Sequence, residues 1–136
     1  MARTTFRNPI RNAGVSRASF AGVPVLVMKA SFDPTSATQI LLGSLPAGSI
    51  PLGVLSLGGA TGGTNPTVDI GTAGSNQGIA NEVDADTLTL TPTTGALTGI
   101  ALTADTAIYG KVGASAATGG TTTILLNYIF DDNGKQ

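Results

Sequence analysis

Residues 38–72 read TQILLGSLPAGSIPLGVLSLGGATGGTNPTVDIGT. Two apolar runs, 39–45 and 50–57, flank the tetrapeptide Pro-Ala-Gly-Ser at 46–49. Proline presets φ for a turn, and glycine accepts the positive φ that many turns require. The pattern therefore predicts two strands joined as a β-hairpin. The glycine pairs that follow predict a long loop, and PTVDIG at 66–71 predicts a third strand.

Further strands are predicted on both sides of this segment. DTLTLT alternates leucine with threonine, which is typical of a strand with one face in water. GVPVLVMKASF is apolar on both faces and predicts a buried strand, and TTTILLNYIF, also apolar on both faces, predicts a central strand. The five added strands are 22–32, 86–91, 95–102, 106–112 with a bulge at Gly110, and 121–130.

The segments between the strands are interpreted as connections. Residues 71–85 are predicted to form a loop, and Gly119-Gly120 a turn. About eight strands at a spacing of about 8–12 residues predict an all-β fold, a single β-sandwich with a jelly-roll-like topology. The domain boundaries expected are an extended basic arm over 1–19 and the β-sandwich domain over 20–136.

Composition limits the function classes. The 136 residues suit one domain, and only 11% of them are charged, against about 25% in typical proteins. Either partner chains cover part of the surface, or Thr, Ser, Asn and Gln supply its polarity.

Strands that are apolar on both faces favour self-association, and we expect a homo-oligomer, a trimer by preference. The longest apolar run, 23–28, is far shorter than the ~18 residues of a membrane helix, and no signal peptide or membrane partner is expected.

The arm is the candidate partner-binding segment. Residues 1–32 hold five of the seven basic residues and none of the eight acidic ones. An extended strip of arginines and single apolar residues suits binding to another protein, with a passive tail as the alternative. Proline, glycine and the lack of stacking aromatics argue against nucleic acid as the partner. The residues assigned to the contact are Arg3, Phe6, Arg7, Ile10, Arg11 and Arg17.

Catalytic and metal chemistry find little support in the residue types. Without histidine or cysteine, no base activates the serines and threonines, so no enzyme activity and no cofactor are expected. The glycine pairs lack the lysine of a phosphate-binding loop. Glu82, Asp84 and Asp86 fall on one side of an extended chain and form a weak Ca²⁺ candidate. A solvated or arginine-paired acidic edge is the preferred interpretation of these three carboxylates.

The central segment also carries a resemblance to a known family. The LPAG turn, the glycine-rich loop and PTVDIGT together resemble small β-rich head proteins of tailed bacteriophages, the decoration (cement) or head-fibre proteins. The resemblance implies a virion structural protein on the outer head surface, assembled in the host cytoplasm, that binds and bridges major capsid subunits. Two alternatives stay open, namely a receptor- or glycan-binding module of a phage tail or fibre and a secreted bacterial surface or adhesin domain.

Overall fold

The structure is a computed structural model that describes residues 24–97 and 99–130. These residues form ten β-strands and no helix, so nothing among them could cross a membrane as a helix. The strands are β1 (Leu26–Phe32), β2 (Ile40–Leu45), β3 (Ser49–Ser56), β4 (Ala60–Thr61), β5 (Thr67–Thr72), β6 (Ser75–Asp84), β7 (Thr89–Pro92), β8 (Thr106–Val112), β9 (Gly119–Gly120) and β10 (Thr122–Phe130).

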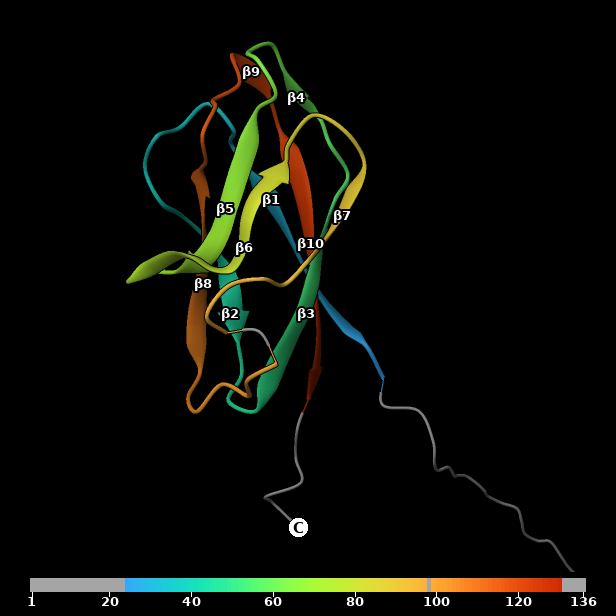
Figure 1. The fold of residues 1–136 in the computed structure, drawn as a ribbon, viewed down its shortest axis with the longest axis vertical. Coiled ribbons are helices and arrows are strands. Elements are labelled where there is room, and N and C mark those ends of the chain that lie inside the picture. The colour runs from blue at the N-terminus through green and yellow to red at the C-terminus, as the bar shows by residue number, and fades with distance from the viewer. Residues whose placement is uncertain (1–23, 98, 131–136) are drawn as a thin grey trace, which may run out of the picture.

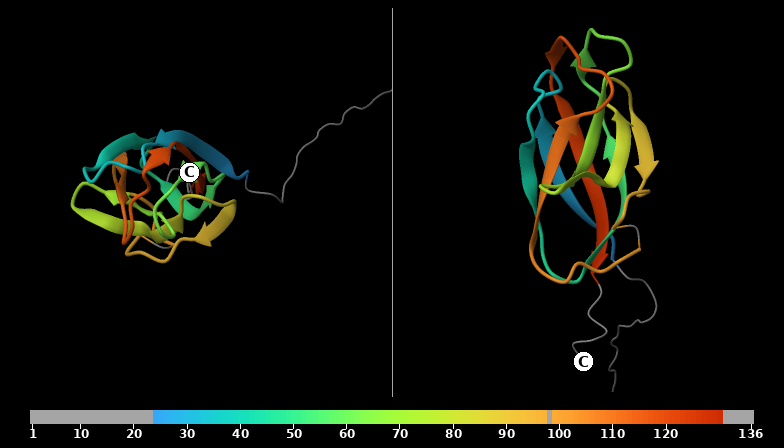
Figure 2. Two further views of the ribbon diagram at one scale, coloured as in Figure 1. Left: turned by 90° about the horizontal axis from the view of Figure 1, so that it is seen from above. Right: turned by 60° about the vertical axis from the view of Figure 1, so that its left-hand side comes forward.

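Eight of these strands form two four-stranded sheets that pack face to face (Figures 1 and 2). Sheet A has the order β1-β10-β3-β7, sheet B has the order β2-β8-β5-β6, and all neighbouring strands are antiparallel. The chain crosses between the sheets after almost every strand, and only β5 and β6 follow each other within one of the two sheets. This order is that of a jelly roll, so the predicted fold class is confirmed.

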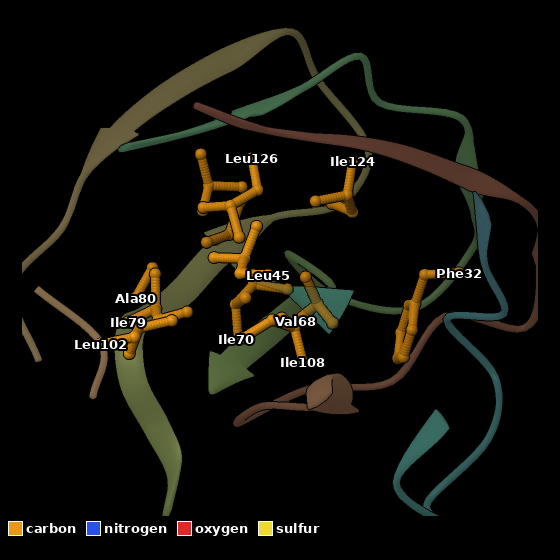
Figure 3. Packing of buried hydrophobic residues seen from close by; sticks show 12 residues of the cluster. Phe32, Leu45, Val68, Ile70, Ile79, Ala80, Leu102, Ile108, Ile124 and Leu126 are labelled. Atoms are coloured by element: carbon orange, nitrogen blue, oxygen red, sulfur yellow. The ribbon is translucent and has the colours of Figure 1, made fainter. Parts of the chain in front are cut away.

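The core lies between the two sheets (Figure 3). Side chains alternate across each strand, so the inward side of every strand contributes to one shared apolar layer. Its members are Phe32, Leu45, Val54, Val68, Ile70, Ile79, Ala80, Val83, Leu102, Ile108, Ile124 and Leu126. The short β4-β9 ladder closes one end of the sandwich over three further buried alanines, Ala60, Ala85 and Ala117.

The turn at 46–49 is present, but the predicted hairpin is wrong. The Ser49 amide donates a hydrogen bond to the Pro46 carbonyl at 3.1 Å, and Gly48 has a φ of 91°. However, the turn connects β2 in sheet B with β3 in sheet A. Leu45 and Val54 must both reach the core and are fully buried. The two strands therefore lie in opposite sheets instead of pairing edge to edge.

The prediction of a buried strand over 22–32 is also wrong. The strand begins at Leu26 and lies at the edge of sheet A beside β10, while residues 22 and 23 fall outside the described ranges. Val25 and Val27 are more than half exposed, and Phe32 at the strand's end is fully buried. Apolar residues on both faces favour cover on both sides of a strand, but they do not show that the same chain provides that cover. The prediction for 121–130 is confirmed, since β10 pairs with β1 on one side and β3 on the other.

Other boundaries need correction. Residues 71–85 are not a loop, because β6 pairs with β5 through a tight connection at Ala73 and Gly74. Register shifts within this pair bury the adjacent residues Ile79 and Ala80 together, which hides the period-two pattern in the sequence. No strand forms among the described residues of 95–102, and β7 covers 89–92 instead of 86–91.

Two glycine positions behave differently from the prediction. The irregularity in the β2-β8 pair lies between Leu41 and Gly43 on β2, so Gly110 is not the bulged residue. The missing side chain at Gly110 instead leaves room for the ring of Phe32, because a Cβ on Gly110 would lie 2.8 Å from Cδ1 of that ring. Gly119 and Gly120 form the strand β9 and not a simple turn, and Gly120 has a φ of 85°.

Candidate functional site

The residues assigned to partner binding from the sequence lie outside the described ranges. Arg3, Phe6, Arg7, Ile10, Arg11 and Arg17 all belong to residues 1–23, as does the predicted boundary between arm and domain. Their role therefore stays a prediction. The described chain begins at Pro24 and leads directly into β1 at the edge of sheet A.

Among the acidic residues at the end of β6, Asp84 uses both of its carboxylate oxygens for local hydrogen bonds. Oδ1 of Asp84 accepts the backbone amides of Asp86 at 3.1 Å and Thr87 at 3.2 Å, and its Oδ2 accepts the Thr87 hydroxyl at 2.8 Å. Glu82 has a positive φ of 51°, and its backbone amide donates to Oδ1 of Asp69 at 2.8 Å. Within residues 24–97 and 99–130, no three acidic side chains lie close enough together to hold a metal ion.

The pKa values of this segment follow from the same contacts. Burial acts to raise the pKa of Asp84, but hydrogen bonds from Asp86 and Thr87 outweigh it and hold this pKa below its usual range. The Asp84 side chain raises the pKa of Asp86, first through hydrogen bonding between the two carboxyl groups and then, together with slight burial, through its charge. The arrangement is that of a turn closed by a carboxylate.

We expect chelation of divalent ions to leave the fold unchanged. The Asp84 oxygens already accept three protein hydrogen bonds, so the turn does not need an ion to hold it together. Adding EDTA should therefore not move the melting temperature, as measured by circular dichroism. A fall of several degrees that Ca²⁺ reverses would show instead that a bound divalent ion stabilises the folded state.

The outer faces of the two sheets differ in character. On sheet B, Asp69 is nearly buried and accepts hydrogen bonds from the Gln77 side chain at 3.1 Å and from the Glu82 amide. Lys111 pairs in register with Asp69 on this sheet, and Asn81 at its edge is exposed. Apart from Leu41, its exposed surface is therefore mainly polar, which is usual for the solvent side of an antiparallel sheet.

The outer face of sheet A is mainly apolar. Leu88 and Leu90, beside and on β7, are 70% and 64% exposed, and Val25 and Val27, beside and on β1, are 56% and 53% exposed. Leu52 on β3 is 40% exposed. Leu55 and Leu125 lie half-buried as a register pair between the two edges, and Leu55 in turn pairs with Leu90. We call this surface the sheet A face.

A shallow groove of about 440 Å³ crosses the sheet A face. It forms where the cross-strand row Asn127–Gly53–Pro92 has no side chain at its middle position. A Cβ on Gly53 would lie 3.9 Å from Cδ1 of Leu90, so the leucine borders the space that the missing side chain leaves. The residues that line the groove are Val25, Leu52, Gly53, Leu90, Pro92 and Asn127.

This face was not identified from the sequence. The alternation in DTLTLT predicts a strand with one wet face, and the structure places the leucines on that wet face with Thr89 and Thr91 half-buried. A signal was present, because a charge-poor chain and strands with two apolar faces already favoured a covered surface. What the pattern could not give is which of the two sheets carries it, since that depends on the order of strands in space.

The comparisons with known proteins agree with this fold. No protein-family model matches the chain, and no curated protein matches it either. A chain of the solved structure "Cyanophage Pam1 capsid asymmetric unit" is similar to it, with a TM-score of 0.59 and 26% sequence identity. The match covers 90% of this chain and 99% of that chain. The predicted resemblance to a phage virion protein is confirmed. The likeness therefore extends over nearly the whole of that chain.

Proposed function

We propose that the protein decorates the head of a phage and strengthens it by bridging neighbouring major capsid subunits. The observation that carries this proposal is the similarity, over nearly the full length of both chains, to a chain from a phage capsid asymmetric unit. The jelly roll fits the role, since this architecture recurs in viral capsid proteins. A structural task also agrees with a chain that lacks histidine and cysteine. We place the protein on the outer head surface, attached to a shell assembled in the host cytoplasm.

The physical basis of such a role is the thermodynamic linkage between binding of the protein and stability of the assembled shell. A protein that binds the assembled shell more tightly than separated subunits stabilises the shell in proportion to that difference in affinity. Bridging produces the difference, because two neighbouring subunits cannot separate without breaking contacts to the bound protein. The packaged genome pushes the shell outward, so these additional contacts raise the force that the head withstands. No catalytic group takes part in this mechanism.

Attachment is assigned to the arm. Its arginines would pair with carboxylates or carbonyl groups of the capsid, and Phe6 and Ile10 would enter apolar pockets. Ordering such a segment costs about 1–2 kcal/mol per residue in backbone entropy, so many contacts must act together. The described chain that follows the arm begins at Pro24 and enters the sandwich through β1 at the edge of sheet A.

Deleting residues 2–19 should weaken attachment to undecorated heads at least about tenfold while the β-sandwich still folds, because those residues supply the contacts that are screened by salt. Raising the salt concentration should weaken the full-length protein in the same direction. The measurement is the occupancy of purified undecorated heads across a protein titration. Removing residues 133–136 from the other end serves as the matched control and should change nothing. Equal occupancy by the arm-deleted and full-length proteins would show that the sandwich itself holds the capsid.

A further inference from the structure

Two leucines of similar exposure lie in opposite settings. Leu90 on sheet A is 64% exposed and lies among Val25, Leu52 and Pro92 along the groove, whereas Leu41 on sheet B is 60% exposed on the more polar face. Single exposed leucines are normal on soluble proteins, but a continuous apolar surface across a whole sheet indicates an interaction site. The sheet A face therefore has the character of an interaction site, and the described residues leave it uncovered.

We propose that the partner at this site is a second copy of the same chain, so that the protein self-associates through the sheet A face. The inference deepens the proposed function and rests on it, because the oligomer is proposed as the form in which the protein acts on the head. Self-association itself is a property of the isolated chain. It can therefore be tested without heads.

The charge distribution favours a second copy as the occupant. Lys29, which pairs in register with Leu125, is the charged residue on the described part of this face, and it sits on the edge strand β1. Its long side chain can keep the ammonium group in water at the rim while its methylene groups cover apolar surface. A face that is otherwise uncharged complements itself, because packing two copies together buries no unpaired charge. A strongly acidic or basic partner would find no matching groups there.

The shape of the groove points the same way. Binding sites for small molecules are concave and combine apolar walls with several polar groups that fix the ligand's orientation. This groove is open and has one polar side chain in its lining, Asn127. It can take an apolar side chain from a flat opposing surface, and Leu88 and Leu90 at one edge of the face are side chains of that kind. When the sheet A face of every copy turns toward the axis of a closed symmetric oligomer, the symmetry brings such grooves and side chains together.

The test compares two matched substitutions. Leu90→Lys places a charge within the sheet A face, and Leu41→Lys places the same charge at a leucine of similar exposure on sheet B. We expect the wild type and Leu41→Lys to form the same oligomer, and Leu90→Lys to raise the dissociation constant at least about thirtyfold. Val27→Lys, at the opposite edge of the face, should act like Leu90→Lys. Light scattering after size-exclusion chromatography and sedimentation equilibrium give the masses, against 13.5 kDa for one chain.

The outcomes separate this inference from the proposed function. All three substituted residues are exposed in the single chain, so each variant should keep the circular dichroism spectrum of the wild type and melt cooperatively, which confirms folding. The variants that lose the oligomer should melt somewhat lower, because self-association no longer stabilises the folded chain. The inference is overturned if the wild type is monomeric at high micromolar concentration, or if Leu90→Lys and Val27→Lys assemble as the wild type does. A wild type that is monomeric but binds undecorated heads would refute self-association and leave the decoration role supported. A wild type that forms the oligomer but does not bind heads would support self-association and refute the decoration role.

Discussion

Replacing Phe32 by alanine is expected to destabilise the protein by about 3–5 kcal/mol, the range for removing a fully buried phenylalanine. Phe32 is fully buried at the end of β1, and its ring packs against Gly110 of β8 in the other sheet. The ring therefore ties the edge strand of sheet A to sheet B. The melting temperature should fall by about 10–20 °C in a calorimetric scan. Phe130→Ala, a phenylalanine that is 38% exposed on β10, is the matched control and should cost about 1 kcal/mol.

A double-mutant cycle identifies the contact responsible. A Cβ on Gly110 would lie 2.8 Å from Cδ1 and 3.0 Å from Cε1 of Phe32, so Gly110→Ala should destabilise the wild type by about 1–3 kcal/mol. In the Phe32→Ala protein the ring is absent, and the same substitution should cost little or even fill part of the cavity. Additive effects in the two backgrounds would contradict this contact and assign the cost of Gly110→Ala to the strand backbone instead.

The Phe32→Ala substitution also bears on function, because Phe32 belongs to β1. This strand carries Val27 of the sheet A face, and the arm precedes it in the chain. If Phe32 fixes β1 in place, its loss should loosen the strand before the rest of the sandwich unfolds. Hydrogen exchange of the β1 amides should then rise more than that of β5 or β8, the strands at the centre of sheet B.

Parts of the fold could be predicted from sequence because the local pattern agrees with the tertiary setting. The strand β8 has the bounds expected for TAIYGKV, and β10 differs from its expected bounds by one residue. Both segments contain β-branched and aromatic residues with few interruptions. The strand β6 was missed because its register shifts place Ile79 and Ala80 in the core side by side. A period-two search cannot recognise a strand whose backbone bulges.

Which strands pair with which was harder to derive, since pairing is decided across the whole chain. The turn at 46–49 has the residues and the hydrogen bond expected of a tight turn, yet it links two sheets. Nothing in the four residues distinguishes a hairpin from such a corner. The same limit applies to the sheet A face, because Leu90 and Val25 are 65 positions apart in sequence and border one groove only through the order β1-β10-β3-β7.

The hairpin between β5 and β6 provides the second large effect. Replacing Gly71 by alanine should destabilise the protein by about 3 kcal/mol or more, beyond the usual range for overpacking because the neighbour is backbone. A Cβ at this position would lie 2.0 Å from the carbonyl oxygen of Ser75 and 2.6 Å from that of Asn76. Neither contact can be relieved by rotating a side chain, so the start of β6 would have to move away from β5.

Gly74→Ala in the same hairpin is the matched control. A Cβ there meets nothing within 4 Å, and neither Gly71 nor Gly74 has a φ in the left-handed region. The two substitutions remove the same backbone freedom from the unfolded chain, which by itself stabilises a protein by about 0.4–1 kcal/mol. Their difference in melting temperature, expected to be about 10 °C or more, therefore isolates the close approach at Gly71. If both variants melt together, β6 begins further from β5 than the structure places it, and the close approach at Gly71 is refuted.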